Sequence, residues 1–88
     1  MEELRSVLLV DDDDDIRTIA EISLAHVGGL QTSLANSGRE GLLLAAAERP
    51  DVILLDMMMP DLDGLATLEL LRAERATADI PVIFMTAK

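Results

Sequence analysis

The sequence predicts one α/β domain whose core is a parallel sheet with helices on both faces. Three short apolar runs, at residues 7–10, 52–55 and 82–85, have the length and composition of buried strands. Segments with apolar residues at helical spacing lie between them, and strands that alternate with helices form parallel sheets through right-handed crossovers. Aspartates follow the first and second of these runs. We therefore expect them at the carboxyl edge of the sheet, where open α/β sheets bind ligands.

Composition narrows the class of function. The 88 residues make at most one domain, and Phe84 is the only aromatic residue, so the core must be aliphatic. A net charge of −10 repels nucleic acid and anionic membranes and favours divalent cations and basic partner surfaces. The sequence has no cysteine, no signal-peptide pattern and no apolar run of the ~18 residues that span a membrane. We expect a cytoplasmic protein that binds neither nucleic acid nor membranes.

The first predicted strand, residues 7–10, is followed by five consecutive aspartates. A helix over about residues 14–27 comes next, because aspartates favour a helix amino terminus and the pair Gly28-Gly29 favours its end. Its apolar residues recur at helical spacing: Ile16, Ile19, Ala20, Leu24 and Val27. Residues 31–35 predict a weaker, alternating strand that is polar enough to form a sheet edge.

A second helix is predicted from its amino-terminal signal. Ser37 and Glu40 fit a capping box, in which the serine hydroxyl accepts from an early backbone amide and the glutamate reaches back. The helix continues through residues 42–47, and Pro50 ends it because proline cannot continue a helix.

The third strand, residues 52–55, leads into Asp56 at the strand end, where we expect metal and water to reach its carboxylate. Pro60 and residues 61–64 predict a turn, since glycine tolerates backbone angles that other residues avoid. A third helix follows, and its predicted buried stripe is Leu65, Leu68 and either Leu71 or Leu70. Residues 73–79 are expected to be a polar connector to the last strand at 82–85.

Polar residues stand at three predicted strand ends: Asp11, Asp12, Asp56 and Thr86. The carboxyl ends of parallel strands share one edge, so we expect these side chains to converge. Crowded carboxylates need a cation, and oxygen ligands with few protein contacts suit Mg²⁺, which predicts a Mg²⁺ site. A carboxylate beside Mg²⁺ can also attack phosphorus, with a hydroxyl such as that of Thr86 donating to the phosphoryl oxygens.

Structural roles are expected for the other polar or unusual residues. Asp13, Asp14 and Asp15 are predicted to be solvated or to cap a helix. The methionines at 57–59 are predicted to pack in the core and loop, because thioethers do not suit a hard cation. His26, near the end of the first helix, is expected on the surface.

Three motifs in this order, VLLVDD, VILLDMMMPDLDG and PVIFMTA, resemble the response-regulator receiver domain of bacterial two-component signalling. The resemblance implies a flavodoxin-like fold and Mg²⁺-dependent phosphorylation by a histidine kinase or phosphotransfer protein. It makes Asp56 the phosphoacceptor and Thr86 the switch hydroxyl that contacts the phosphoryl group. The implied metal ligands are Asp11, Asp12, Asp56 and the backbone carbonyl of Met58. Met58 and Lys88 would be the positions that tune phosphoryl lifetime.

The sequence departs from this family after the third motif. Family members continue through a fourth helix, a fifth strand that bears a lysine, and a fifth helix, whereas this sequence stops at Lys88. We therefore expect residues 1–88 to form a single, C-terminally incomplete receiver with strand order 2-1-3-4 and impaired phosphorylation. Lys88 stands two residues past Thr86, so it is not assigned the role of the fifth-strand lysine.

Two alternative functions stay open at this point. An aspartyl-phosphate phosphatase or phosphotransferase also has a nucleophilic aspartate after a strand, but it needs an acid two positions later, where this chain has Met58. A fragment without chemistry that serves as an interaction or dimerisation module is the other alternative. The leading expectation is a phosphoacceptor and not an enzyme, with at most Mg²⁺-assisted self-phosphorylation and self-dephosphorylation. The apolar strand at 82–85 is expected to be an exposed edge that supports a homodimer.

Overall fold

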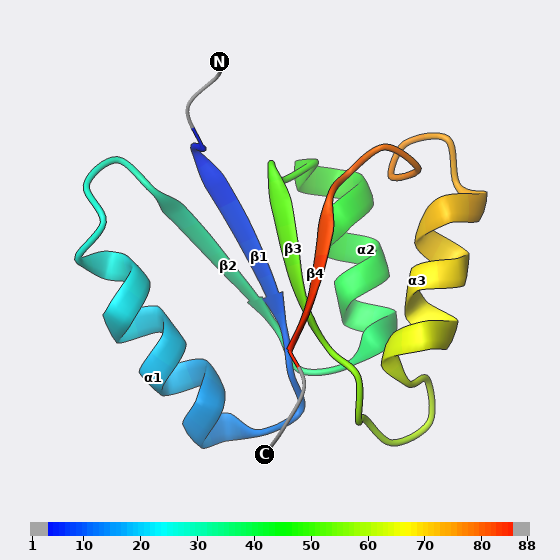
Figure 1. Cartoon of the computed structure of the whole chain (residues 1–88), viewed down its shortest axis with the longest axis horizontal. Helices are drawn as coiled ribbons and strands as arrows, with labels where there is room; N and C mark the ends of the chain where they lie inside the picture. The colour runs from blue at the N-terminus through cyan, green and yellow to red at the C-terminus, as the bar shows by residue number, and fades with distance from the viewer. Residues whose placement is uncertain (1–3, 86–88) are drawn as a thin grey trace.

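The computed structural model describes residues 4–85, which form a parallel four-stranded sheet and three helices (Figure 1). The strands are β1 (Ser6–Val10), β2 (Gln31–Ala35), β3 (Val52–Asp56) and β4 (Val82–Met85). Their order across the sheet is β2-β1-β3-β4, so the predicted order is confirmed and β2 and β4 form the two edges.

Helices cover both faces of the sheet, as predicted. Helix α1 (Asp14–Ala25) lies on one face, and α2 (Gly38–Glu48) and α3 (Gly64–Ala73) lie side by side on the other (Figure 1). The main core fills the space between the sheet and the pair α2 and α3. Its largest members are aliphatic, as the composition required: Leu8, Val10, Ile53, Leu55 and Leu71.

The register of the strands places their carboxyl ends level with one another. Val10 pairs with Ala35 on one side and with Leu55 on the other, and Leu55 pairs with Phe84. Loops therefore leave the sheet at a common edge. Asp11 and Asn36 directly follow β1 and β2, and Asp56 is the last residue of β3.

Helix α1 differs from its prediction in length and in burial. It ends at Ala25, with His26 as its carboxyl-terminal cap, so the predicted extension to Val27 is wrong. None of its residues is fully buried, and Ile19 is 60% exposed. The half-buried positions are Ile16, Arg17, Ala20 and Leu24, which share one stripe. Apolar residues outside that stripe stay exposed because α1 is the only described helix on its face of the sheet.

The buried stripe of α3 also differs from its prediction. Leu71 is 1% exposed and Leu68 is half-buried, but Leu65 is 56% exposed and is not part of the stripe. Thr67, at 1% exposure, lies one helical turn before Leu71 and takes the inward position. Spacing alone left the rotation of the helix about its axis undetermined, because leucines occur on several of its sides.

The polar connector after α3 is held by side-chain hydrogen bonds to backbone carbonyls. Thr77 is 2% exposed, and its Oγ1 donates a hydrogen bond to the carbonyl of Leu71 at 2.6 Å. Arg72 Nη1 donates to the carbonyls of Ala78 and Ile80, at 2.9 and 2.8 Å. The bond from Thr77 satisfies a carbonyl group in the last turn of α3, and the bonds from Arg72 fix the path of the connector into β4.

The helices of the described residues are all too short and too polar to cross a bilayer.

Candidate functional site

Asp11 is held rigidly at the end of β1. Its backbone N–H donates to the carbonyl of Ala35 at 3.0 Å, which continues the pairing with β2 by one residue. Its side-chain Oδ1 accepts the N–H of Asp13 at 2.9 Å, and the residue is only 2% exposed. The carboxylate therefore has a fixed orientation at the sheet edge.

The next aspartates turn the chain into α1. Asp13 is the amino-terminal cap: its Oδ1 accepts the N–H groups of Asp15 and Ile16, at 2.9 and 3.3 Å. Asp14 and Asp15 occupy the first turn, where negative charge is favoured by the helix dipole. The structural role predicted for these three aspartates is confirmed, and Asp12 is left exposed on the turn.

Asp56 ends β3, level with Met85 of β4. It is 1% exposed, so the expectation that water reaches this carboxylate directly is wrong. Its Oδ1 accepts the backbone N–H of Met58 at 3.0 Å, which fixes the rotation of the carboxylate. The chain then turns closely over the strand end, since the N–H of Gly64 donates to the carbonyl of Met57 at 3.2 Å.

The three carboxylates predicted to converge do so. One oxygen from each of Asp11, Asp12 and Asp56 can be chosen so that all lie within 4.8 Å of one another. Two of these residues are buried and one is exposed. Three carboxylates this close repel one another unless a cation offsets their charge, and oxygen ligands suit a hard cation that keeps part of its water shell. The donor set therefore fits Mg²⁺.

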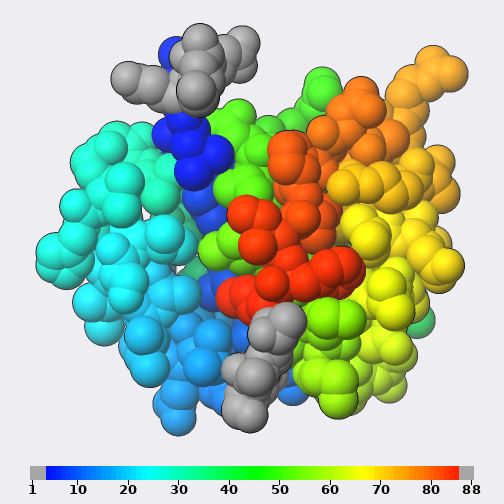
Figure 2. Space-filling view, in the orientation of Figure 1, coloured from blue at the N-terminus to red at the C-terminus, as the bar shows by residue number. Residues whose placement is uncertain are grey.

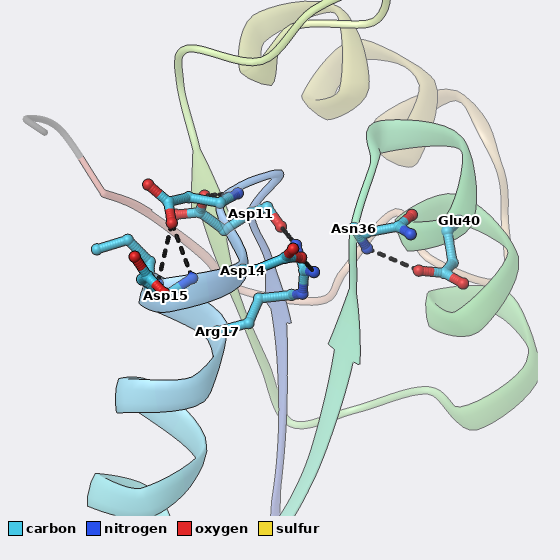
Figure 3. A network of polar contacts seen from close by, with 8 residues as sticks. Asp11, Asp14, Asp15, Arg17, Asn36 and Glu40 are labelled. Carbon is cyan, nitrogen blue, oxygen red and sulfur yellow. Dashed lines mark hydrogen bonds and ion pairs between the residues drawn. The ribbon is translucent and has the colours of Figure 1, made fainter.

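A cleft of about 400 Å³ adjoins this cluster, with Asp12 on its wall. Its other walls come from the first turn of α1, the start of α2 and the loop before α3. On the α2 side Ser37 Oγ accepts the N–H of Glu40 at 3.1 Å, as the predicted capping box requires. Glu40 Oε1 reaches back one residue beyond the cap and accepts the N–H of Asn36 at 2.6 Å (Figure 3). The cleft wall is therefore held by hydrogen bonds from backbone N–H groups to side-chain oxygens.

The structure describes some of the remaining residues singled out in the sequence, and others lie outside the described range. Met59 is 7% exposed and packs in the core, as expected for the methionines, whereas Met58 is 74% exposed. His26 lies at the far end of α1 from the aspartates, with its Nδ1 2.8 Å from the carbonyl of Ile22. Thr86 and Lys88 lie outside the described residues, so their roles stay predictions.

Arg17 belongs to the site and was missed by sequence reasoning. Its Nη1 donates to the backbone carbonyl of Asp11 at 2.6 Å, and its Nη2 forms an ion pair with Asp14 (Figure 3). The spacing of three residues between Asp14 and Arg17 was a usable signal for the ion pair. The contact with the Asp11 carbonyl had no comparable signal, because it depends on the turn between β1 and α1.

The sequence model of the response regulator receiver domain matches residues 7–88. This chain belongs to the response-regulator receiver family. It is 45% identical over 83 residues to the transcriptional regulatory protein AfsQ1 of Streptomyces coelicolor, covering 94% of this chain and 35% of that protein. It is 39% identical over 87 residues to the regulatory protein AtoC of Escherichia coli, covering 99% of this chain and 18% of AtoC.

Solved structures show the same fold. The N-terminal domain of a response regulator receiver protein from Methanoculleus marisnigri JR1 superposes with a TM-score of 0.90 at 42% identity, covering 98% of this chain and 69% of that chain. Chemotaxis protein CheY4 of Vibrio cholerae superposes with a TM-score of 0.88 at 30% identity, covering 98% of this chain and 71% of the CheY4 chain. The receiver described here thus spans about a third or less of the two curated relatives and about 70% of these two solved chains.

Membership in the family fixes the general class of function. Receiver domains are signalling modules of two-component systems and not enzymes of the usual kind, and a phosphate-donating kinase is the partner that such a domain implies. Receiver domains bind Mg²⁺ in an acidic pocket, and the carboxylates of Asp11, Asp12 and Asp56 form such a cluster in this chain.

Proposed function

We propose that this receiver accepts a phosphoryl group on Asp56 in a reaction that depends on Mg²⁺. The metal ligands in this proposal are Asp11, Asp12, Asp56 and the backbone carbonyl of Met58. The observation that carries the proposal is the convergence of the three carboxylates within 4.8 Å at the ends of two adjacent strands. The donor is a histidine kinase or a phosphotransfer protein, as family membership suggests.

The chain's own residues supply the acceptor and its orientation. The N–H of Met58 holds Oδ1 of Asp56, so the carboxylate is oriented before a donor arrives. A carboxylate oxygen of Asp56 attacks phosphorus, the bond from phosphorus to the donor nitrogen breaks, and that nitrogen keeps the electron pair. Mg²⁺, when bound, offsets negative charge on the phosphoryl group during transfer. Thr86 is proposed to donate its hydroxyl to a phosphoryl oxygen.

The proposed chemistry is that of an acceptor, without turnover of a separate substrate. A phosphatase of the aspartyl-phosphate type needs a general acid two positions after the nucleophile, and Met58 cannot transfer a proton. Self-phosphorylation from small donors and self-dephosphorylation are the reactions that the site supports. The enzyme alternative is therefore not favoured by any residue of the site.

Incubation with acetyl phosphate followed by intact-mass measurement tests this function. We expect the native chain to gain the mass of one phosphoryl group with Mg²⁺ present and to gain none with a chelator. Asp56→Asn should gain none, because an amide cannot act as the acceptor. Asp61→Asn is the matched control: Asp61 lies in the loop after β3 with φ 64°, a conformation that asparagine tolerates. An adduct that persists in Asp56→Asn would refute the assignment.

We also propose that the chain forms a homodimer through the edge of β4. The support is that β4 pairs only with β3 among the described strands and that Ile83 is 56% exposed. Figure 2 shows the atoms of β4 at the surface between α1 and α3. An open apolar edge is a template for pairing with another chain.

A further inference from the structure

Arg17 is mostly buried among acidic groups, although it is a cation. Its side chain is 16% exposed, and it reaches back from α1 to the turn that carries Asp11 and Asp12 (Figure 3). The guanidinium contacts two parts of that turn at once, with Nη1 on the backbone carbonyl of Asp11 at 2.6 Å and Nη2 on the carboxylate of Asp14. A planar fork of donors suits such a double contact, and a single ammonium group does not.

Two of the described hydrogen bonds of the turn join residues that are close in sequence. The N–H of Asp13 donates to the side chain of Asp11, and the N–H of Asp15 donates to the side chain of Asp13. Asp13 is also joined to the helix, since its Oδ1 accepts the N–H of Ile16 at 3.3 Å and its carbonyl accepts the N–H of Arg17 at 3.1 Å. The guanidinium of Arg17 adds a contact two residues earlier, at the carbonyl of Asp11. Five adjacent carboxylates also repel one another, which favours an opened turn.

The atom that Arg17 contacts on Asp11 is decisive. The guanidinium binds the carbonyl oxygen of Asp11 and not its carboxylate. The contact therefore fixes the backbone of the turn without using Arg17 to neutralise the side chain that the proposed Mg²⁺ site needs. The ion pair with Asp14 offsets the positive charge of Arg17, which limits its repulsion of a bound cation.

We propose that Arg17 is a positioning residue that holds the turn between β1 and α1 in the shape that presents Asp11 and Asp12 to Mg²⁺. The inference rests on the proposed function for its ligand, but the ordering of the turn is a property of the chain without metal. Groups that orient metal ligands contribute about 10-fold to about 100-fold to metal affinity. We place Arg17 at the lower end, a factor of about 10.

Isothermal titration with MgCl₂ at matched ionic strength tests the effect on affinity. Arg17→Ala should weaken Mg²⁺ binding by a factor of about 10. Loss of a positive charge alone would strengthen the binding of a cation, so a weakening has the opposite sign from a pure charge effect. Arg39→Ala is the matched control: Arg39 lines the same cleft and is exposed, and its removal should leave the affinity unchanged or slightly higher.

The variant Arg17→Lys distinguishes the effect of positive charge from the effect of the planar guanidinium donors. Lysine keeps the positive charge but offers one ammonium group. The Mg²⁺ affinity of Arg17→Lys should therefore lie between the affinities of the native chain and of Arg17→Ala. Full native affinity in Arg17→Lys, or equal affinities for Arg17→Ala and Arg39→Ala, would overturn the proposal.

A second measurement needs no metal. Backbone ¹⁵N relaxation of the native chain with chelator should give order parameters of about 0.85 for the amides of Asp12 and Asp13. These order parameters should fall toward about 0.6 in Arg17→Ala and should stay high in Arg39→Ala. Unchanged order parameters in Arg17→Ala would overturn the positioning role. A native chain with an ordered turn that binds no Mg²⁺ would instead overturn the proposed function.

Discussion

Asp12 differs from the other two carboxylates of the cluster in its exposure. Asp11 and Asp56 are buried at the ends of their strands and take part in backbone hydrogen bonds, so replacing either one also disturbs the fold. Asp12 lies on the exposed side of the turn. It is therefore the residue whose replacement reports most directly on the cation.

Replacement of Asp12 should remove stabilisation by Mg²⁺. At about 100 times its dissociation constant, a ligand that binds only the folded state stabilises it by about 2.7 kcal/mol. Asp12→Ala should abolish this shift, while Asp14→Ala should keep it, because Asp14 lies outside the cluster. Thermal melts followed by circular dichroism, with Mg²⁺ and with chelator at matched ionic strength, measure this stabilisation in both variants. Equal melting temperatures of the native chain in the two conditions would rule out the metal site.

Asp51 makes a second set of contacts at the amino-terminal ends of the strands, at the opposite end of the sheet from the carboxylate cluster. Its Oδ2 accepts the N–H groups of Arg5 and Ser6, at 2.7 and 3.0 Å, and its own N–H donates to Ser6 Oγ at 3.1 Å. The N–H of Arg5, followed by that of Ser6, holds the pKa of the Asp51 carboxyl below its usual value of 3.8. These bonds tie the start of β1 to the start of β3.

The depressed pKa of Asp51 predicts a pH dependence of stability. The folded state binds the proton less readily than the unfolded state, so the contribution of Asp51 is fully present above pH 3.8 and is lost as pH falls through the lower folded pKa. Urea unfolding of the native chain and of Asp51→Asn, from about pH 6 to about pH 2, measures this. The stability difference between them should shrink only in the acid range. A difference that does not change with pH would show that the carboxylate charge has no such role.

At the scale of elements, the connection between β3 and α3 shapes the site. Asp56 ends the strand, Asp63 caps the helix through its Oδ1, which accepts the N–H of Ala66 at 2.9 Å, and Gly64 begins the helix. Gly64 lies so close to the strand end that an added Cβ would stand 2.6 Å from the carbonyl oxygen of Asp56 and from Cα of Met57. The start of α3 and the end of β3 are therefore in direct backbone contact.

A side chain at Gly64 should destabilise the fold. Gly64→Ala places the new methyl group against backbone atoms that cannot rotate away, and crowding of this kind costs about 1–3 kcal/mol. Gly28→Ala is the matched control, because a Cβ there meets no atom within 4 Å, and its stability should stay within about 1 kcal/mol of the native value. Urea unfolding compares the two variants. Equal stability of Gly64→Ala and the native chain would contradict the close packing of strand and helix.

At the scale of the whole molecule, the two faces of the sheet are covered unequally. Helices α2 and α3 cover one face over the core, whereas α1 alone lies on the other among the described residues (Figure 1). Ile83, on the edge strand β4, is 56% exposed as a result. Exposed apolar surface at a sheet edge favours association, while a net charge of −10 on each chain opposes it.

Association through β4 should respond to one substitution and to salt. Ile83→Lys should raise the dimer dissociation constant, because a charge on the edge opposes strand pairing. Leu43→Lys is the control: Leu43 is 73% exposed on α2, on the opposite face. Sedimentation equilibrium measures both variants, and higher salt should strengthen association of the native chain by screening its charge. A well-folded monomer at hundreds of micromolar would overturn the proposed dimer.

The resemblance to the receiver family implied the order of the strands. The sequence alone determined the strands and the convergence of Asp11, Asp12 and Asp56. These follow from local patterns: apolar runs form buried strands, and the carboxyl ends of parallel strands share one edge. The helix starts were also readable, since Asp13, Ser37 and Asp63 each cap a helix through a side-chain oxygen.

Only the tertiary structure decided which side of each helix faces the sheet and how the site is enclosed. Thr67 takes the inward position expected for Leu65, and Thr77 is buried within a segment of polar composition. Asp56 is shielded while Asp12 is exposed, and Arg17 reaches the carbonyl of Asp11. Helix rotation, burial and long side-chain contacts are set by packing between residues far apart in sequence, so a local pattern carries no information about them.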